Sequence, residues 1–150
     1  MIPITRSSEY AIRAMTYMAR AQNPADFVLV RDMARLLRVP APFLGKCLQH
    51  LVAHGLLQSQ RGRNGGFRLT RPPSAISLHE VVDSQEDLGR TRACLLGQAE
   101  CSDERACPMH VFWKKASNDF VGRLSTTSLA DVVAFCAANP QSEYPTQKAL

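Results

Sequence analysis

The sequence contains no long apolar run and no recognisable secretory signal. None of its hydrophobic stretches approaches the ~18–20 residues that a membrane-spanning helix needs. The N-terminal segment also lacks a basic stretch followed by an apolar core and a small-residue cleavage site. We therefore expect a cytoplasmic protein that makes no contact with a membrane. With 45% hydrophobic residues among its 150 positions, the chain can still bury a core the size of one domain.

The sequence also lacks the side-chain pattern of a nucleophilic enzyme. No second His or Asp lies near its cysteines in a nucleophile–base arrangement, and His79 is better interpreted as an exposed helix residue. We therefore predict that the protein is not an enzyme. Because cytosolic thiols stay reduced, its five cysteines indicate metal or redox chemistry rather than disulfides.

Acidic residues are scarce in the first half of the chain. Residues 1–71 carry eleven Lys and Arg against three Asp and Glu, a net charge of +8, whereas residues 72–150 carry seven against ten, a net charge of −3. A basic half beside an acidic half indicates nucleic-acid binding by the first half. The alternative is a basic face that only contacts solvent.

Hydrophobic periodicity predicts a mainly α-helical protein with one small β-hairpin. A short β-like run at 27–30 interrupts the helical pattern, and strands are predicted at 56–60 and 67–70 around a turn rich in glycine and arginine. Helices are predicted at 5–22, 31–37, 42–54, 78–83, 109–124 and 128–137. Helix, helix, helix and hairpin in this order describe a winged helix-turn-helix.

In such a fold the second helix of the pair enters the major groove, which makes residues 42–54 the predicted recognition helix. Lys46 and Gln49 are best placed to reach base edges, and His50 faces the same way. Gly62, Gly65 and Gly66 would allow a tight wing tip that approaches phosphates or a narrow groove closely. The predicted DNA contacts are therefore Arg38, Lys46, Gln49, His50, Arg61, Arg63 and Arg68, with Arg38 directed at phosphate and the other arginines on the wing.

A second cluster of functional residues lies in a polar segment with no helix or strand period. It holds Cys94, Cys101, Cys107 and His110. Thiolates suit iron–sulfur clusters and zinc, and the Cys107-Pro108 pair is typical of iron–sulfur sites. The close C-x2–4-C pair of structural zinc sites is missing, which weakens the zinc interpretation without removing it. Cys47 and Cys136 fall on apolar helix faces and are expected to be core residues.

These features together resemble the Rrf2 family of winged-helix transcription regulators, of the IscR, NsrR and RirA types. The resemblance rests on LGKCLQHLVAHGLLQSQRGRNGGFRLTR at 44–71, ISLHEVVD at 76–83, the three spaced cysteines and the long helix after them. It covers about residues 2–137. It implies a homodimer in which helix 109–124 packs against its partner, with Phe112, Trp113 and Phe120 as anchors.

The resemblance also implies an iron–sulfur cluster held by Cys94, Cys101 and Cys107, with [2Fe–2S] favoured over [4Fe–4S]. Two residues compete for the fourth position: His110 matches the histidine ligand of the IscR type, and Glu9 matches the carboxylate ligand of the NsrR type, which the other subunit can donate. Two departures stand out. The gap between Cys94 and Cys101 is one residue longer than in the IscR pattern, and Gly45 replaces an acidic residue of the recognition helix.

The sequence thus predicts four segments: a winged helix-turn-helix domain at 1–83, a cluster-binding loop at 84–108, a dimerisation helix and closing helix at 109–138, and a disordered tail at 139–150. The predicted function is a dimeric repressor that binds a palindromic promoter operator in double-stranded DNA. It would sense iron–sulfur status, redox stress or nitric oxide. The alternative is a zinc-bound or cluster-free regulator whose cysteines form a thiol switch.

Overall fold

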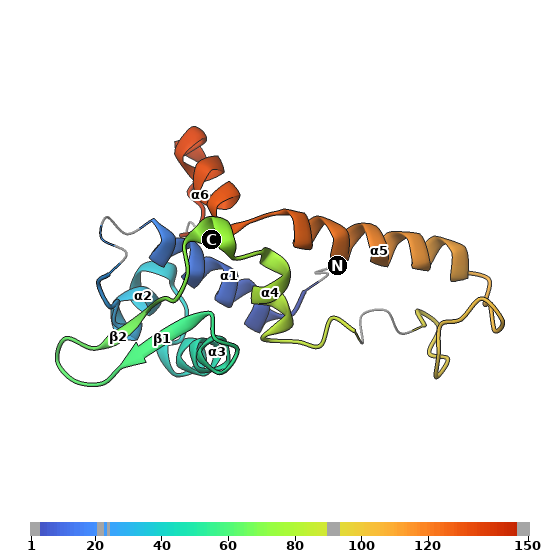
Figure 1. Cartoon of the computed structure of the whole chain (residues 1–150), viewed down its shortest axis with the longest axis horizontal. Coiled ribbons are helices and arrows are strands. Elements are labelled where there is room, and N and C mark those ends of the chain that lie inside the picture. Colours follow the sequence, from blue (N-terminus) through green and yellow to red (C-terminus); the bar gives the residue numbers. More distant parts are fainter. Residues whose placement is uncertain (1–3, 21–22, 24, 90–93, 147–150) are drawn as a thin grey trace.

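The fold is a helical body that carries a two-stranded wing and one long projecting helix (Figure 1). The computed structural model describes residues 4–20, 23, 25–89 and 94–146. Within these residues the elements are α1 (Arg6–Ala19), α2 (Val30–Leu37), α3 (Ala41–Ala53), β1 (Leu57–Gln60), β2 (Gly66–Leu69), η1 (Pro73–Ala75), α4 (Leu78–Asp83), α5 (His110–Thr126), α6 (Leu129–Ala138) and η3 (Pro140–Ser142). The predicted fold class, mainly α with a small hairpin, is confirmed.

Helix α1 forms the centre of the body because its apolar positions recur at helical spacing. Ala11, Ala14 and Met15 are fully buried, and α1 packs against α3, α4 and α6. Its first turn is capped by Thr5, whose hydroxyl accepts a hydrogen bond from the Ser8 amide at 3.2 Å. The described part of the predicted helix 5–22 ends at Ala19, and residues 21 and 22 lie outside the described residues.

Helices α2 and α3 form the predicted helix-turn-helix. The turn passes through Arg38, whose φ of 54° lies in the left-handed region, and Pro40 then precedes α3. Leu44, Leu48 and Leu51 of α3 are fully buried, whereas Lys46, Gln49 and His50 of the same helix are exposed. Helix α3 begins one residue before the predicted start, with Pro42 still in its first turn, where a missing N–H costs nothing.

The wing is an antiparallel pair in which Leu57 faces Leu69 and Gln60 faces Gly66. Of the predicted β-like run 27–30, only Val28 pairs, through a bridge to Phe67, and Val30 already belongs to α2. Gly66 has a φ of +127°, and a Cβ there would lie 2.2 Å from the Val28 carbonyl oxygen. This glycine therefore lets the wing dock closely against the body.

The junction between α5 and α6 is hydrogen-bonded to the segment at the start of α4. The Leu78 amide donates to the Thr127 carbonyl at 2.9 Å, and the Leu129 amide donates to the Ile76 carbonyl at 2.8 Å. Ser77 and Ser128, the N-caps of α4 and α6, form capping boxes with Glu80 and Asp131. These bonds hold one end of α5 against α4, while its other end projects away from the body with the cysteine loop (Figure 1).

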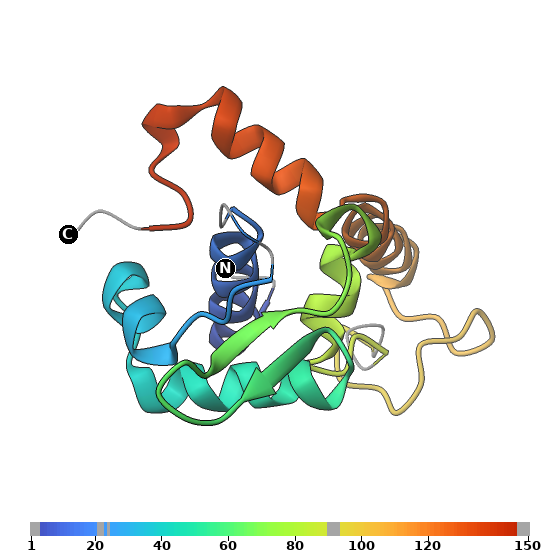
Figure 2. The same cartoon turned by 60° about the vertical axis from the view of Figure 1, so that its left-hand side comes forward.

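The structure differs from the sequence expectation in the C-terminal segment. Residues 139–146, predicted to be part of a disordered tail, contain η3 and turn back toward α1 (Figure 2). The Arg13 Nε donates to the Pro145 carbonyl at 2.8 Å, and Pro145 is buried. Residues 147–150 lie outside the described residues. No helix in the described ranges is long and apolar enough to cross a membrane.

Candidate functional site

The predicted DNA-binding residues gather between α3 and the wing. Gln49, Arg61 and Arg63 line one surface hollow of about 630 Å³. Lys46 and His50 line a neighbouring hollow of about 580 Å³, and Gln49 borders both. All five side chains are exposed. Because these residues come from two separate elements, the fold brings together a polar and basic surface that could follow both a groove and its phosphates.

The hollow between α3 and the wing also contains residues that sequence reasoning missed. Arg31, in the first turn of α2, has a side chain that is 82% exposed, and Ser59 and Gln60 lie on β1. The position of Arg31 could have predicted this. It lies at the start of the helix before the predicted recognition helix, and that helix crosses the DNA backbone in such folds. The two β1 residues carried no such signal.

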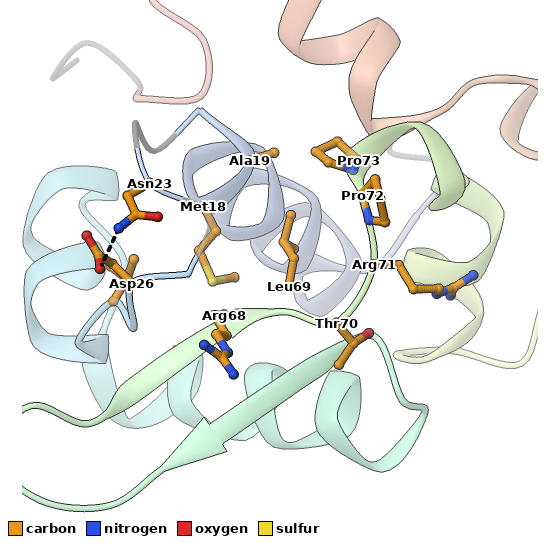
Figure 3. A pocket seen from close by; sticks show the side chains of 11 residues that line it. Met18, Ala19, Asn23, Asp26, Arg68, Leu69, Thr70, Arg71, Pro72 and Pro73 are labelled. Atoms are coloured by element: carbon orange, nitrogen blue, oxygen red, sulfur yellow. Dashed lines mark hydrogen bonds between the residues drawn. The ribbon is translucent and has the colours of Figure 1, made fainter.

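Arg68 occupies a different surface from the other wing arginines. Its guanidinium lies 4.5 Å from the centre of the Phe27 ring, and it donates to Gln58 Oε1 at 3.0 Å and to the Ala25 carbonyl at 2.9 Å. Figure 3 shows Arg68 beside Met18 and Asp26 at the wall of a largely apolar cavity of about 310 Å³. These contacts hold the wing to residues 25–27. Arg38, by contrast, is exposed at the turn before α3.

The four predicted ligands of the cysteine loop lie in two pairs. The Cys94 and Cys107 sulfurs are 3.9 Å apart, and the Cys101 sulfur lies 3.4 Å from His110 Nδ1. Cys94 and His110 are buried, whereas Cys101 and Cys107 are half-buried. His110 begins α5, and the other three ligands lie on the loop before it. Residues 90–93 of the predicted cluster-binding loop lie outside the described residues.

Backbone amides surround the first cysteine. Hydrogen bonds from the backbone of Gln98, and then of Leu96 and Gly97, lower the pKa of the Cys94 thiol against the opposing effect of burial. Burial raises the pKa of Cys101, and negative charge on the nearby Cys94 and Cys107 raises it further. Sulfur ligands crowded in this way are typical of a metal or cluster site, where a cation offsets the repulsion between their charged forms.

The pair distances are close to those between two ligands of one metal ion. Two ligands on one tetrahedral metal lie about 3.3–3.8 Å apart when metal–ligand bonds are about 2.0–2.3 Å. Within the described ranges, no three His, Cys, Asp or Glu side chains converge on a single ion. The donor set of three thiolates and one imidazole is compatible with iron–sulfur chemistry.

Glu9 lies apart from these ligands. Its carboxylate is 3.6 Å from the Arg13 guanidinium within α1, and its side chain is 24% exposed. Figure 1 places α1 in the body and the cysteine loop at the outer end of α5. The fold of one chain therefore brings His110, and not Glu9, to the cysteines.

Taken together, the winged helix-turn-helix and its basic hollow define a DNA-binding transcription regulator with a thiolate-rich loop. A family model described as Rrf2, iron-dependent transcriptional regulator, matches residues 4–134. Protein aau3 of Rhizobium meliloti (strain 1021) is 34% identical over 142 residues, which cover 94% of this chain and 89% of that protein. The chain thus belongs to the Rrf2 family, whose members are DNA-binding transcription regulators rather than enzymes.

Solved structures share the same fold. CymR (YrzC), the global cysteine regulator of B. subtilis, superimposes with a TM-score of 0.74 at 20% identity, covering 90% of this chain and 98% of CymR. IscR of T. potens superimposes with a TM-score of 0.69 at 19% identity, covering 97% of this chain and 93% of IscR. At these identities the similarity describes the fold alone.

Proposed function

We propose that the protein is a cytoplasmic, homodimeric repressor that binds a palindromic operator and senses iron–sulfur status, redox stress or nitric oxide through a [2Fe–2S] cluster. The observation that carries this proposal is the pairing of four ligands at 3.9 Å and 3.4 Å in a family of DNA-binding regulators. A binuclear cluster needs two ligands on each iron, which is the arrangement of Cys94 with Cys107 and Cys101 with His110.

The fourth ligand in this proposal is His110. Its Nδ1 faces the Cys101 sulfur, and its position at the start of α5 connects the ligand directly to a helix. Glu9 is already paired with Arg13 in its own chain. Cluster content of His110→Ala and Glu9→Ala decides between the two. Loss of cluster in Glu9→Ala with full content in His110→Ala would overturn the assignment.

The DNA-binding part of the proposal places α3 in the major groove and the wing over an adjacent groove. Lys46, Gln49 and His50 would meet base edges, and Arg61 and Arg63 the groove and phosphates beside it. Arg38 and Arg31 would meet phosphate, while Arg68 would act by holding the wing in place. A palindromic operator follows from two such surfaces related by dimer symmetry.

The dimer in this proposal forms through α5. Val111 and Phe112 are 81% and 63% exposed on this helix, which is rare for apolar side chains that have no partner. The accessible surface of 9520 Å² also exceeds the roughly 7,600 Å² of a compact monomer of this mass. A second copy would cover part of this excess.

In this mechanism the ligands at the start of α5 bias the pose of the two recognition helices. When bound, an iron–sulfur cluster supplies a centre whose oxidation state and integrity respond to oxidants and nitric oxide. His110 starts α5, the residue after the far end of α5 is hydrogen-bonded to the start of α4 through Thr127 and Leu78, and α4 packs on α1, which packs on α3. A shift of His110 would therefore be transmitted along α5 to the DNA-binding half.

The first experiment is a visible absorption spectrum of protein purified without oxygen, before and after addition of nitric oxide or air. A coloured protein that loses iron in the Cys101→Ser variant and bleaches with one of these signals supports the proposal. Cys47→Ser is the matched control, because Cys47 is buried on α3, where it contacts Ser7 and Gln85 rather than the proposed ligands. A colourless, iron-free protein after reconstitution contradicts it.

The alternative function, a thiol-switch regulator, is favoured by one observation: the Cys94 and Cys107 sulfurs lie 3.9 Å apart and could close to a disulfide, whose S–S bond is about 2.05 Å. An oxidant such as hydrogen peroxide would take up the two electrons and the two thiol protons. Mass spectrometry of the cluster-free protein tests this. A Cys94–Cys107 disulfide that changes DNA affinity in protein that never binds iron would support the alternative.

A further inference from the structure

We propose that Asp103 and Lys114 are positioning residues that set the ring orientation and tautomer of His110. The proposal rests on the proposed role of His110 as a cluster ligand and goes beyond it by assigning the groups behind that ligand. It concerns one loop residue and one helix residue that sequence reasoning did not single out.

The first step is the contact between Asp103 and the imidazole. Asp103 Oδ1 lies 2.8 Å from His110 Nε2, and the opposite ring nitrogen, Nδ1, faces the Cys101 sulfur at 3.4 Å. A carboxylate can only accept a hydrogen bond, so Nε2 must carry the proton and donate it. In the neutral ring, Nδ1 then presents a lone pair toward the cysteine side, which is the state needed of a metal-ligating imidazole.

The second step is the burial of the imidazole. The His110 side chain is 6% exposed, whereas Asp103 is 75% exposed. Water therefore has little access to the ring, and the carboxylate is the partner that the structure gives Nε2. Histidines that bind metals commonly donate their second ring N–H to a carboxylate in this way, which fixes the tautomer and raises ligand basicity.

Lys114 in turn fixes the position of Asp103. Lys114 Nζ lies 2.9 Å from both Asp103 oxygens, and Lys114 follows His110 by four positions on α5. His110 and Lys114 therefore lie on one face of the helix, one turn apart, and both contact the Asp103 carboxylate. This arrangement ties the loop between Cys101 and Cys107 to the first turns of α5.

Asp103 and Lys114 could instead form a surface ion pair that has no further role. Exposed pairs contribute little stability by themselves, and the chain offers a matched example in Lys115 and Asp119, which form an i,i+4 ion pair on the same helix. Within the part of the chain that the structure describes, neither Lys115 nor Asp119 is seen to contact a proposed cluster ligand. Its variants therefore separate the loss of a surface charge from the loss of a positioning contact.

The test compares Asp103→Ala, Asp103→Asn and Lys114→Gln with Lys115→Gln and Asp119→Ala. In the cluster-free protein, ¹⁵N NMR of the His110 ring reports the tautomer directly. We expect the Nε2–H tautomer in the wild type and in both controls. Asp103→Ala should show a mixture of tautomers. Asp103→Asn should keep part of the preference for Nε2–H, because its amide oxygen still accepts a hydrogen bond. A His110 tautomer unchanged by Asp103→Ala would overturn the proposal.

In the reconstituted protein the second readout is the rate of iron release to a chelator. We expect release about 10–100-fold faster in Asp103→Ala, the range typical for loss of such a partner, a smaller increase in Lys114→Gln, and no change in the controls. Equal rates in Asp103→Ala and Asp119→Ala would also overturn it. If His110→Ala leaves iron content unchanged, the proposed ligand fails, while the NMR result still decides the Asp103 contact.

Discussion

Arg13 is a buried cation that joins three separate segments. Its side chain is 3% exposed; it donates to the Leu37 carbonyl at the end of α2 and to the Pro145 carbonyl near the C-terminus, and it lies 3.6 Å from Glu9. Burying a guanidinium is costly unless its donors are satisfied. The C-terminal segment thus takes part in satisfying a charge inside the DNA-binding half.

Replacing Arg13 with methionine should destabilise the fold. The Leu37 and Pro145 carbonyls lose their donor, and each buried group left without a partner costs about 1–3 kcal/mol. Urea unfolding measures the change. Arg20→Met is the control, because Arg20 is exposed and its hydrogen bond to the Tyr144 carbonyl is long, at 3.3 Å. There we expect the free energy of unfolding to fall by about 0.5 kcal/mol or less. Equal losses in the two variants would contradict the structural role of Arg13.

Substitutions on the DNA face should separate phosphate contacts from base contacts. Arg61→Ala should weaken binding to all sequences alike and reduce the slope of log affinity against log salt by about 0.9 for each lost phosphate contact. Gln49→Ala should instead relax discrimination at one base pair, by about 1–3 kcal/mol. Fluorescence anisotropy at several salt concentrations, with operator and unrelated DNA, measures both. A salt-independent affinity would contradict the proposed interface.

At the scale of elements, the helices and strands were predictable because their signals are local. Leu44, Leu48 and Leu51, three of the apolar residues whose period predicted a helix over 42–54, are fully buried in α3. The β-like run at 27–30 was misleading, because Val28 pairs only with Phe67 and tertiary packing starts α2 at Val30. Apolar character alone does not tell a strand from the entry to a helix.

The side-chain partners within the candidate site were less predictable. Spacing identified Cys94, Cys101, Cys107 and His110, but it did not indicate which of them pair, because loop conformation has no sequence period. Arg68 illustrates the same limit: its charge and position on the wing predict DNA contact, which stays a prediction, but no local pattern indicated that Phe27, Gln58 and Ala25 contact its guanidinium. Contacts between distant segments depend on packing that no local pattern records.

Helix α5 provides a prediction about assembly. If α5 packs against a second copy, Phe112→Asp should place a carboxylate in an apolar interface and raise the dimer dissociation constant at least about tenfold, since burying a Phe side chain is worth about 1.5–3 kcal/mol. Asn118→Asp, on an exposed position of the same helix, adds the same charge and should change little. Sedimentation velocity over a concentration series measures both. A monomeric wild type would contradict the proposed dimer.

At the scale of the whole molecule, packed elements connect the cysteine loop to the predicted recognition helix. His110 begins α5, α5 packs on α4, α4 packs on α1, and α1 packs on α3. A helix of 17 residues is about 25 Å long. Such a helix carries a displacement at one end to the other without needing a flexible intermediate.

This path predicts reciprocal coupling between cluster and operator. If the cluster changes operator affinity by some factor, operator DNA must change cluster affinity by the same factor, because the two bindings share one thermodynamic cycle. We expect a factor in the range of about 5–150, typical of such coupling.

Titrations of loaded and cluster-free protein with operator give the first factor. Chelator competition with and without operator, run to equilibrium, gives the second. Asp119→Ala should leave both factors unchanged, because its ion pair with Lys115 lies on the exposed surface of α5. Equal operator affinity of the loaded and cluster-free forms would mean that the loop and the DNA face are independent, and the cysteines would then serve a role separate from DNA binding.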